Sequence, residues 1–436
     1  MIRSEIDFSI RRKRLCEELL EDSVVIVASA SSRYRNADAD YPFRQDSNFY
    51  YLSGFDEPES IIVLTSFGKE NKFNLFCRDR DPLREQWDGF RSGQEGAIKD
   101  FGADEAYSIS LADELIPSII EGANNIYYSM SSPNGINLRI EGWLNQIRSK
   151  TRQGSEVPEN LLSLDSILDE LRLLKTEEEV KLMRIAGEIS CEAHIRGMEK
   201  VLPGMFEYQL EGEYLHTFIN RGARFPAYNS IVGGGNNACI LHYKENSSQL
   251  NDNDLVLVDA GCEYNNYASD VTRTYPVGKK FSDEQKKIYE VVLEAHKQAC
   301  NAIKPGNSWN IAQDKSVEVI TEGLIDLGIL KGNPGNLIKT GAYSKYYMHR
   351  VGHWIGMDVH DVGNYKKYGK WRELEPGMVL TVEPGIYILD SLKGVEEKWL
   401  GIGIRIEDDL LVTEHGHEIL TSNAPKEIKD IENLKS

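Results

Sequence analysis

LVLVDAGCEYNNYASDVTRTYPV, residues 255–277, joins an apolar run, a polar turn and a second run rich in β-branched and aromatic residues. This order predicts a β-hairpin. If the hairpin is symmetric, its centre lies between Tyr264 and Asn265. Asp259 and Asp270 are then cross-strand partners with Cβ atoms about 5 Å apart. Two carboxylates would share one face of the sheet.

Such a pair of carboxylates is unfavourable on half-buried strands, because like charges repel and desolvation adds to the cost. A bound metal ion removes this problem. Taken alone, however, a simpler interpretation is stronger: Asp259 ends its strand as a turn residue and Asp270 faces solvent, since Asp is common at strand ends and turns. The rest of the sequence has to distinguish the two.

Further candidate ligands follow in three short motifs. They are His349, His353 and His360 in MHRVGHWIGMDVHD, Glu383 in TVEPG and Glu407 in IRIEDD. Four carboxylates and one imidazole suit two divalent cations of the harder sort such as Mn²⁺, with Zn²⁺ or Co²⁺ as alternatives. Each motif alone also has a simpler interpretation, as a core or surface histidine, a turn or a surface ion pair.

Local chemistry supports the two glutamates as site residues. The proline after Glu383 forces an extended backbone at that position. Arg405 and Glu407 are two apart on a predicted strand and project to the same face, so the guanidinium can offset and orient the acidic cluster. Asp408 and Asp409 are expected to be the solvent-side members of an acidic run.

The composition excludes several classes of function. The chain has 436 residues with 50 Lys+Arg against 69 Asp+Glu, a formal net charge of -19, which repels nucleic acid and anionic lipid surfaces. No stretch resembles a secretory signal or a membrane span. The six cysteines are scattered without a CxxC pair, which is typical of reduced thiols. We therefore expect a cytoplasmic protein with no nucleic-acid or membrane partner.

Length and patterning predict two domains. The first mixes helical and strand patterns and is expected to be α/β. Its predicted elements are a helix near 12–20 and strands near 24–28, 49–52, 61–64 and 73–76. A polar segment, 151–160, precedes a change of pattern, and we place the domains at 1–172 and 173–436.

Two long helices and several strands are predicted in the second domain. The capping-box spacings Thr176-x-x-Glu179 and Ser282-x-x-Gln285 predict where the helices begin. In addition to the hairpin, strands are expected over 378–384 and 403–412.

Taken together, these motifs resemble one family. The ordered set DAGCEYNNYASDVTRT, ILHYKEN, MHRVGHWIGMDVHDVG, LTVEPGIYI and GIGIRIEDD is similar to the pita-bread metallopeptidases, and within them to the aminopeptidase P branch. The stretches PGMFEYQLEGEY, RFPAYNSIVGGGNNA and YPFRQDSNFYYLSGFDEPE extend the resemblance over nearly the whole chain. It implies an α/β amino-terminal domain followed by an α+β pita-bread catalytic domain, and an aminopeptidase that acts on peptides with proline in second position.

The resemblance also implies roles for individual residues. Two metal ions would be held by five ligands, with Asp270 and Glu407 bridging; the ligands are Asp259, Asp270, His353, Glu383 and Glu407. The residues implied to line the site without ligating are His242, His349, His360 and Arg405. At Arg350, directly after His349, the resemblance implies a smaller residue in some relatives, which leaves the shape and charge of the neighbouring pocket rim open.

In the implied mechanism, a hydroxide that bridges the two metals attacks the scissile carbonyl. Glu383 accepts the proton of the water, and His349 and His360 donate hydrogen bonds to the oxyanion or the peptide carbonyl. His242 steadies the substrate's main chain. A bond to proline has no N–H and a fixed φ, so it requires a dedicated pocket.

Two alternatives stay open at this point. A prolidase performs the same chemistry on Xaa-Pro dipeptides only and uses a cationic residue to capture the free carboxylate. A non-catalytic peptide-binding module on the same fold would be expected to lack one or more ligands. The resemblance further implies a homotetramer or dimer in which Trp87 approaches a neighbouring subunit's active site. HExxH, P-loop, GxSxG and GxGxxG motifs are absent from the sequence.

Overall fold

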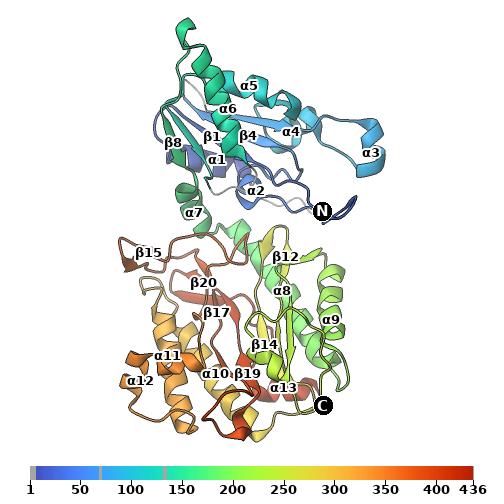
Figure 1. The fold of residues 1–436 in the computed structure, drawn as a ribbon, viewed down its shortest axis with the longest axis vertical. Helices are drawn as coiled ribbons and strands as arrows, with labels where there is room; N and C mark the ends of the chain where they lie inside the picture. Colours follow the sequence, from blue (N-terminus) through green and yellow to red (C-terminus); the bar gives the residue numbers. More distant parts are fainter. Residues whose placement is uncertain (1–5, 68–70, 131–134, 436) are drawn as a thin grey trace. The chain divides into compact units, whose positions relative to one another are not determined.

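The computed structural model describes residues 6–67, 71–130 and 135–435, which form two compact units (Figure 1). One unit ends at Leu171 and the other begins at Arg172, next to the boundary that the sequence places at residue 172. Across the described ranges, no helix combines the length and the apolarity that a membrane crossing requires.

A six-stranded mixed sheet forms the centre of the first unit, with the order β6-β5-β4-β1-β7-β8. Its strands are β1 (Ser23–Ala28), β4 (Ile61–Ser66), β5 (Lys72–Cys77), β6 (Glu105–Ser108), β7 (Asn125–Tyr128) and β8 (Asn160–Ser163), and a small hairpin joins β2 (Tyr34–Asn36) and β3 (Ala39–Asp40). β1 pairs antiparallel with β4 and parallel with β7. The sheet is therefore mixed. Together with the helices that alternate with its strands, it confirms the predicted α/β class.

Helices cover the sheet of the first unit. They are α1 (Phe8–Glu17), α2 (Ser47–Ser53), α3 (Pro82–Asp88), α4 (Gly93–Phe101), α5 (Ala112–Ile120), α6 (Ile136–Ser149) and α7 (Asp165–Leu173), the last of which extends into the second unit. Ile116 of α5 and Trp143 of α6 pack with Val24 and Ile61 in one buried cluster. The strands near 24–28, 61–64 and 73–76 are therefore strands of a sheet, as predicted.

The prediction of a strand at 49–52 is wrong, because this segment lies in α2. Asp46 caps the helix by accepting a hydrogen bond from the Phe49 N–H, and Gly54 ends it with φ 65°, donating its N–H to the Tyr50 carbonyl. These two caps satisfy backbone groups at both helix ends. Together they outweigh the strand preference of the aromatic residues between them.

Two helices and a set of antiparallel strands form the first half of the second unit. They are α8 (Glu177–Lys200), α9 (Glu207–Asn220), β9 (Phe225–Pro226), β10 (Ile231–Gly234), β11 (Leu255–Asp259), β12 (Cys262–Tyr264), β13 (Tyr267–Ala268) and β14 (Thr272–Pro276). The capping box predicted at Thr176 and Glu179 is present at the start of α8.

The second half repeats this order of helices before strands. It comprises α10 (Asp283–Ala302), α11 (Ile311–Asp326), α12 (Pro334–Thr340), β15 (Lys366–Lys367), β16 (Lys370–Trp371), β17 (Val379–Val382), β18 (Gly385–Ile388), β19 (Ile402–Arg405), β20 (Asp408–Thr413), β21 (Gly416–Ile419) and α13 (Ile428–Leu434). The capping box predicted at Ser282 is also present. In Figure 1, α8 and α9 lie on one side of the central strands and α10, α11 and α12 on the other.

The predicted hairpin exists, but its register differs from the predicted one. Its turn is Asn265–Asn266, where both residues have positive φ, 48° and 66°, as a tight two-residue turn requires. Tyr264 consequently pairs with Tyr267, and Asp259 pairs with Thr272 rather than with Asp270. The predicted polar turn was too long because its first half, Cys262–Tyr264, is the strand β12.

A close backbone approach next to Asp259 fixes the course of this hairpin. A Cβ atom added at Gly261 would lie 1.8 Å from the carbonyl oxygen of Ser269. That oxygen belongs to the backbone and cannot rotate away. Only glycine therefore fits at position 261. The missing side chain allows the segment around Asp270 to cross close to the end of β11.

We expect Gly261→Ala to lower the free energy of unfolding by about 3 kcal/mol, the upper range for overpacking a filled interior. Urea denaturation followed by circular dichroism measures this loss. Gly212→Ala in α9 is the matched control, because its Cβ would meet nothing within 4 Å and alanine favours a helix by about 0.5–1 kcal/mol. Similar unfolding energies for the two variants would contradict the close approach.

Candidate metal centre

The two aspartates of the hairpin converge although they are not cross-strand partners. Asp259 ends β11, and Asp270 lies between β13 and β14. The hydroxyl of Tyr228 donates toward both, at 2.6 Å from Asp259 Oδ1 and 2.6 Å from Asp270 Oδ1. Both aspartates are buried, so the interpretation in which Asp270 faces solvent is wrong.

The second half of the unit brings three more predicted residues to the same place. His353 Nε2 lies 3.4 Å from Asp270 Oδ2 and 3.7 Å from Glu383 Oε1. Glu407 follows β19 and is fully buried. One ligand atom each of Asp270, His353 and Glu407 fall within 4.8 Å of one another, close enough to hold one metal ion.

The tautomer of His353 suits metal binding. Its Nδ1 lies 2.9 Å from the carbonyl oxygen of Trp354, and because a carbonyl only accepts, Nδ1 carries the proton. Nε2 is therefore the ring nitrogen available to a metal ion. Burial lowers the pKa of His353, but the hydrogen bond to Asp270 and the charges of Glu383 and Asp270 outweigh this effect and raise the pKa to about 9, so a metal ion would take the place of the Nε2 proton.

Burial makes the negative charge at this place costly. It raises the pKa of Glu383 to about 7 and that of Asp259 to about 6, in both cases against the attraction of Arg405. Burial, and after it the charge of Asp270, raises the pKa of Glu407 well above its usual value. Four carboxylates thus share the site with few cationic groups. The donor set of oxygens and one imidazole, with negative charge in excess, fits divalent cations.

Arg405 is the cationic side chain that the sequence placed beside the cluster. Its guanidinium donates to Asp259 Oδ2 at 2.5 Å and to Thr272 Oγ1 at 3.1 Å. Thr272 in turn donates to Glu407 Oε2 at 2.6 Å. Arg405 thus reaches Glu407 through Thr272 and fixes the position of Asp259 directly.

The cluster forms the floor of a cavity of about 1030 Å³. His242, His349 and His360 also line it, as the sequence predicted, and the ring of His360 lies edge-on to that of His353, with centroids 4.4 Å apart.

His349 is already engaged by the protein at both ring nitrogens. Nδ1 lies 2.7 Å from the Arg350 carbonyl and Nε2 lies 2.8 Å from the Tyr387 hydroxyl. Burial, and after it the charge of Arg405, lowers the pKa of His349 to about 3, so the ring is neutral. Its single N–H points at the carbonyl, which leaves His360 as the freer hydrogen-bond donor of the two.

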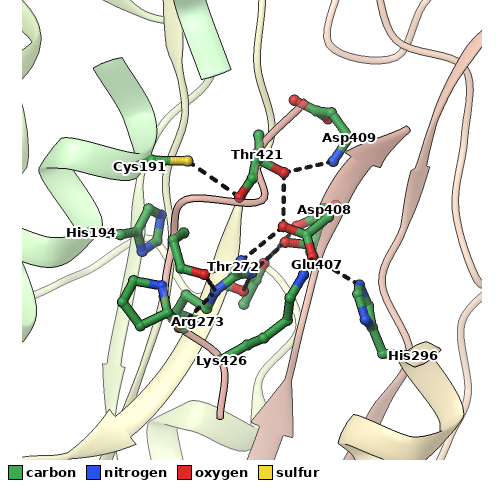
Figure 2. Close-up of polar contacts among 12 residues, drawn as sticks. Cys191, His194, Thr272, Arg273, His296, Glu407, Asp408, Asp409, Thr421 and Lys426 are labelled. Carbon is green, nitrogen blue, oxygen red and sulfur yellow. Dashed lines mark hydrogen bonds and ion pairs between the residues drawn. The ribbon is translucent and has the colours of Figure 1, made fainter. Parts of the chain in front are cut away.

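The expectation that Asp408 and Asp409 face solvent is wrong, because both are fully buried behind the cluster. Asp408 accepts hydrogen bonds from Arg273 at 2.8 Å and from Thr421 at 2.8 Å, and it also contacts His296 and Lys426 (Figure 2). This group of contacts is called the Asp408 network below.

The Asp408 network and Asp409 each hold the backbone of one cluster residue. Arg273 donates to the Glu407 carbonyl at 2.6 Å, and Asp409 Oδ2 accepts from the Asp270 N–H at 3.0 Å. Burial and the charge of Asp270 raise the pKa of Asp409 well above its usual value. Of the three acidic residues 407–409, only Glu407 lies in the cavity floor. Asp408 and Asp409 lie behind it and hold the backbone of Glu407 and Asp270 in place.

Three residues that contact the predicted ones were not predicted from the sequence. They are Tyr228, Thr272 and Tyr387, all bonded to the carboxylates, to Arg405 or to His349. All three lie inside stretches that carry the family resemblance. No spacing rule in the sequence pointed to their hydroxyls.

Comparison with known proteins identifies the family. The family model "Metallopeptidase family M24" matches residues 181–414, which include the candidate ligands. The chain belongs to metallopeptidase family M24. A second model, "Aminopeptidase P, N-terminal domain", matches residues 8–127 of the first unit. The predicted aminopeptidase P-like and pita-bread domains are thereby confirmed.

Relatives of this M24 chain match it along nearly its whole length. It is 46% identical to the Xaa-Pro aminopeptidase of Haemophilus influenzae over 98% of this chain and 96% of that protein. It is 43% identical to the Xaa-Pro aminopeptidase of Escherichia coli over 99% of this chain and 98% of that protein.

Solved structures of related enzymes have nearly the same fold as this chain. Aminopeptidase PepP of Pseudomonas aeruginosa superposes with a TM-score of 0.98 and 50% identity, covering 100% of this chain and 99% of that chain. Aminopeptidase P from Escherichia coli with the inhibitor Pro-Leu gives a TM-score of 0.96 and 43% identity, covering 99% of each chain.

We expect Asp408→Ala to lower the free energy of unfolding by about 3–5 kcal/mol, because it leaves the buried Arg273 without its charge partner. Chemical denaturation measures this loss. Glu418→Ala is the control: Glu418 pairs with Arg184 at 2.7 Å, but both side chains are at least a third exposed, so the loss is below about 1 kcal/mol. Equal losses would show that the Asp408 network is not the stronger support.

Proposed function

We propose that this M24 chain is an Xaa-Pro aminopeptidase, which removes the amino-terminal residue from peptides whose second residue is proline. The observation that carries the proposal is the convergence of Asp270, His353 and Glu407 within 4.8 Å, in a chain 43–46% identical to proteins of that name. The metallopeptidase family explains why a buried acidic cluster faces an open cavity.

The proposed ligands divide between the two halves of the second unit. Asp259 and Asp270 come from the hairpin, and His353, Glu383 and Glu407 come from the segments around β17 and β19. Asp270 and Glu407 would be the carboxylates shared between two ions. When bound, divalent cations, most simply Mn²⁺ with Zn²⁺ or Co²⁺ as alternatives, would lower the pKa of a water and polarise the scissile carbonyl.

The remaining chemistry falls to the side chains of the chain. Glu383, which lies beside the site of the proposed ions, would accept the proton of the attacking water. His360, and with it His349 once its contact with the Arg350 carbonyl is released, would donate a hydrogen bond to the oxyanion or the peptide carbonyl. His242 would steady the substrate's main chain. Arg405 holds Asp259 in position. His349 lines the wall through its bond to Tyr387.

The proposal also includes the oligomeric state and the cellular location of the protein. A homo-oligomer, a tetramer or dimer, is supported by the apolar side chains of α3 and the turn after it, because Leu83, Trp87 and Phe90 are 75%, 85% and 73% exposed and such a patch is typical of an interface. A cytoplasmic location is supported by the six free cysteines, which a reducing compartment maintains.

The activity itself is tested on matched peptides. We expect Ala-Pro-Ala to release alanine, Ala-Ala-Ala to be cleaved at least about 100-fold more slowly, and chelation followed by Mn²⁺ addition to abolish and restore the activity. Chromatography of the products measures all three. Cleavage of Ala-Pro with no cleavage of Ala-Pro-Ala would support a prolidase instead, and absence of both with Mn²⁺ present would contradict any peptidase.

The ligand assignment has a separate test. We expect Asp270→Asn to lower the affinity for Mn²⁺ by at least about 100-fold, because a neutral amide replaces a charged carboxylate that both ions would share. Metal content by mass spectrometry and the rise in melting temperature on Mn²⁺ addition measure the change. Asp283→Asn, in the first turn of α10, is the control and should bind Mn²⁺ as the wild type does. Unchanged metal content in Asp270→Asn would rule out Asp270 as a ligand.

A further inference from the structure

Three exposed cationic side chains line the active-site cavity. Lys244, Arg350 and Lys366 line the same cavity as the acidic cluster, and all three are exposed. Trp371 lies between two of them, because the Arg350 guanidinium is 4.9 Å and the Lys366 ammonium 4.2 Å from its ring centroid. These four residues are called the basic rim.

The local structure holds the basic rim in place. β15 and β16 form a two-stranded hairpin in which Lys366 pairs directly with Trp371, so both side chains lie on one face. Arg350 is anchored from another element, since it donates to Asn310 Oδ1 at 2.6 Å, next to the start of α11. The planar guanidinium has N–H groups left for a second acceptor.

No acidic side chain within the described ranges forms an ion pair with the three cations. The chain carries 69 acidic residues and a formal net charge of -19, and many of its exposed cations are paired, as Arg184 is with Glu418 and Arg221 with Glu192. Exposed positive charge that has no carboxylate partner among the described residues therefore lines the same cavity as the buried acidic cluster.

This distribution of charge is complementary to a peptide. An aminopeptidase substrate has a positive amino end, which the floor attracts, and a carboxylate farther along. A cavity of about 1030 Å³ lies at the top of the range of ligand pockets, about 300–1,000 Å³, so it has room for residues beyond proline. The rim is the part of the cavity that such residues would reach.

We propose that the basic rim binds a carboxylate of the substrate beyond proline, so that the enzyme selects peptides that are short or acidic after the Xaa-Pro pair. The inference rests on the proposed aminopeptidase function and adds a specificity determinant to it. The carboxylate can be the carboxyl terminus of a tripeptide or the side chain of an acidic third residue. In both cases Arg350 supplies the directional contact and the two lysines add charge.

Three peptides distinguish these sources: Ala-Pro-Ala, its carboxyl amide, and Ala-Pro-Glu amide. We expect the KM of the wild type for the free acid to be about fivefold lower than for the neutral amide, the size expected for an exposed charge pair, with little change in kcat. A low KM for the Glu amide identifies the side chain as a second acceptable source. Because the rim is exposed, 0.5 M NaCl should remove most of the preference.

Arg350→Gln tests the residue. We expect it to bring the KM values for acid and amide to within about twofold, since the charge-assisted contact is lost. Lys339→Gln is the matched control: it removes one exposed, unpaired positive charge from α12, outside the cavity lining. This variant should retain the wild-type preference.

A binding measurement without turnover completes the test. The dipeptide Pro-Ala and its amide have no Xaa-Pro bond to cleave, and calorimetry of the Mn²⁺-loaded protein should show tighter binding of the acid to the wild type only. Equal affinity and equal KM for acid and amide, with cleavage intact, would overturn the role of the rim alone. Absence of cleavage of every peptide would instead overturn the proposed function.

Discussion

The burial of several carboxylates in one cavity floor is the constraint on which the second unit depends. Such groups repel one another and lose hydration, so the fold has to hold them together by contacts from outside. Tyr228 ties two of them through one hydroxyl. Arg405 neutralises part of the charge, the Asp408 network fixes the backbone of Glu407, and Asp409 fixes that of Asp270. The acidic floor is thus built on a second, fully buried layer of ion pairs.

Those parts of the fold that depend on local chemistry could be predicted from the sequence. The capping boxes at Thr176 and Ser282 mark where the two longest helices begin, because their hydrogen bonds form between residues three apart. The α2 helix was mistaken for a strand because its aromatic residues outweighed the caps in the prediction. The predicted register of the hairpin was wrong because Asn265 and Asn266 adopt left-handed conformations and form the turn. The alternation of apolar residues does not reveal such conformations.

The site was predictable in its residue types, but not in its contacts. The sequence and the family resemblance named the residues that the structure brings to one cavity, although only the chain path brings Asp259 and Glu407 together. The sequence does not show which neighbouring side chains form hydrogen bonds and ion pairs with those residues. Asp408 and Asp409 were expected at the surface because acidic runs usually lie there, but their burial depends on partners such as Arg273, which is 135 residues away from Asp408 in the chain.

Ligands drawn from both halves of one unit have a mechanical consequence. Any ion held jointly by Asp270 and Glu407 acts as a reversible cross-link between chain segments that the unfolded polypeptide would separate widely. Binding energy of this kind favours the folded state only, and it closes a long loop. The resident ion would therefore protect the enzyme from proteolysis, so that metal supply could set the lifetime of the protein as well as its turnover.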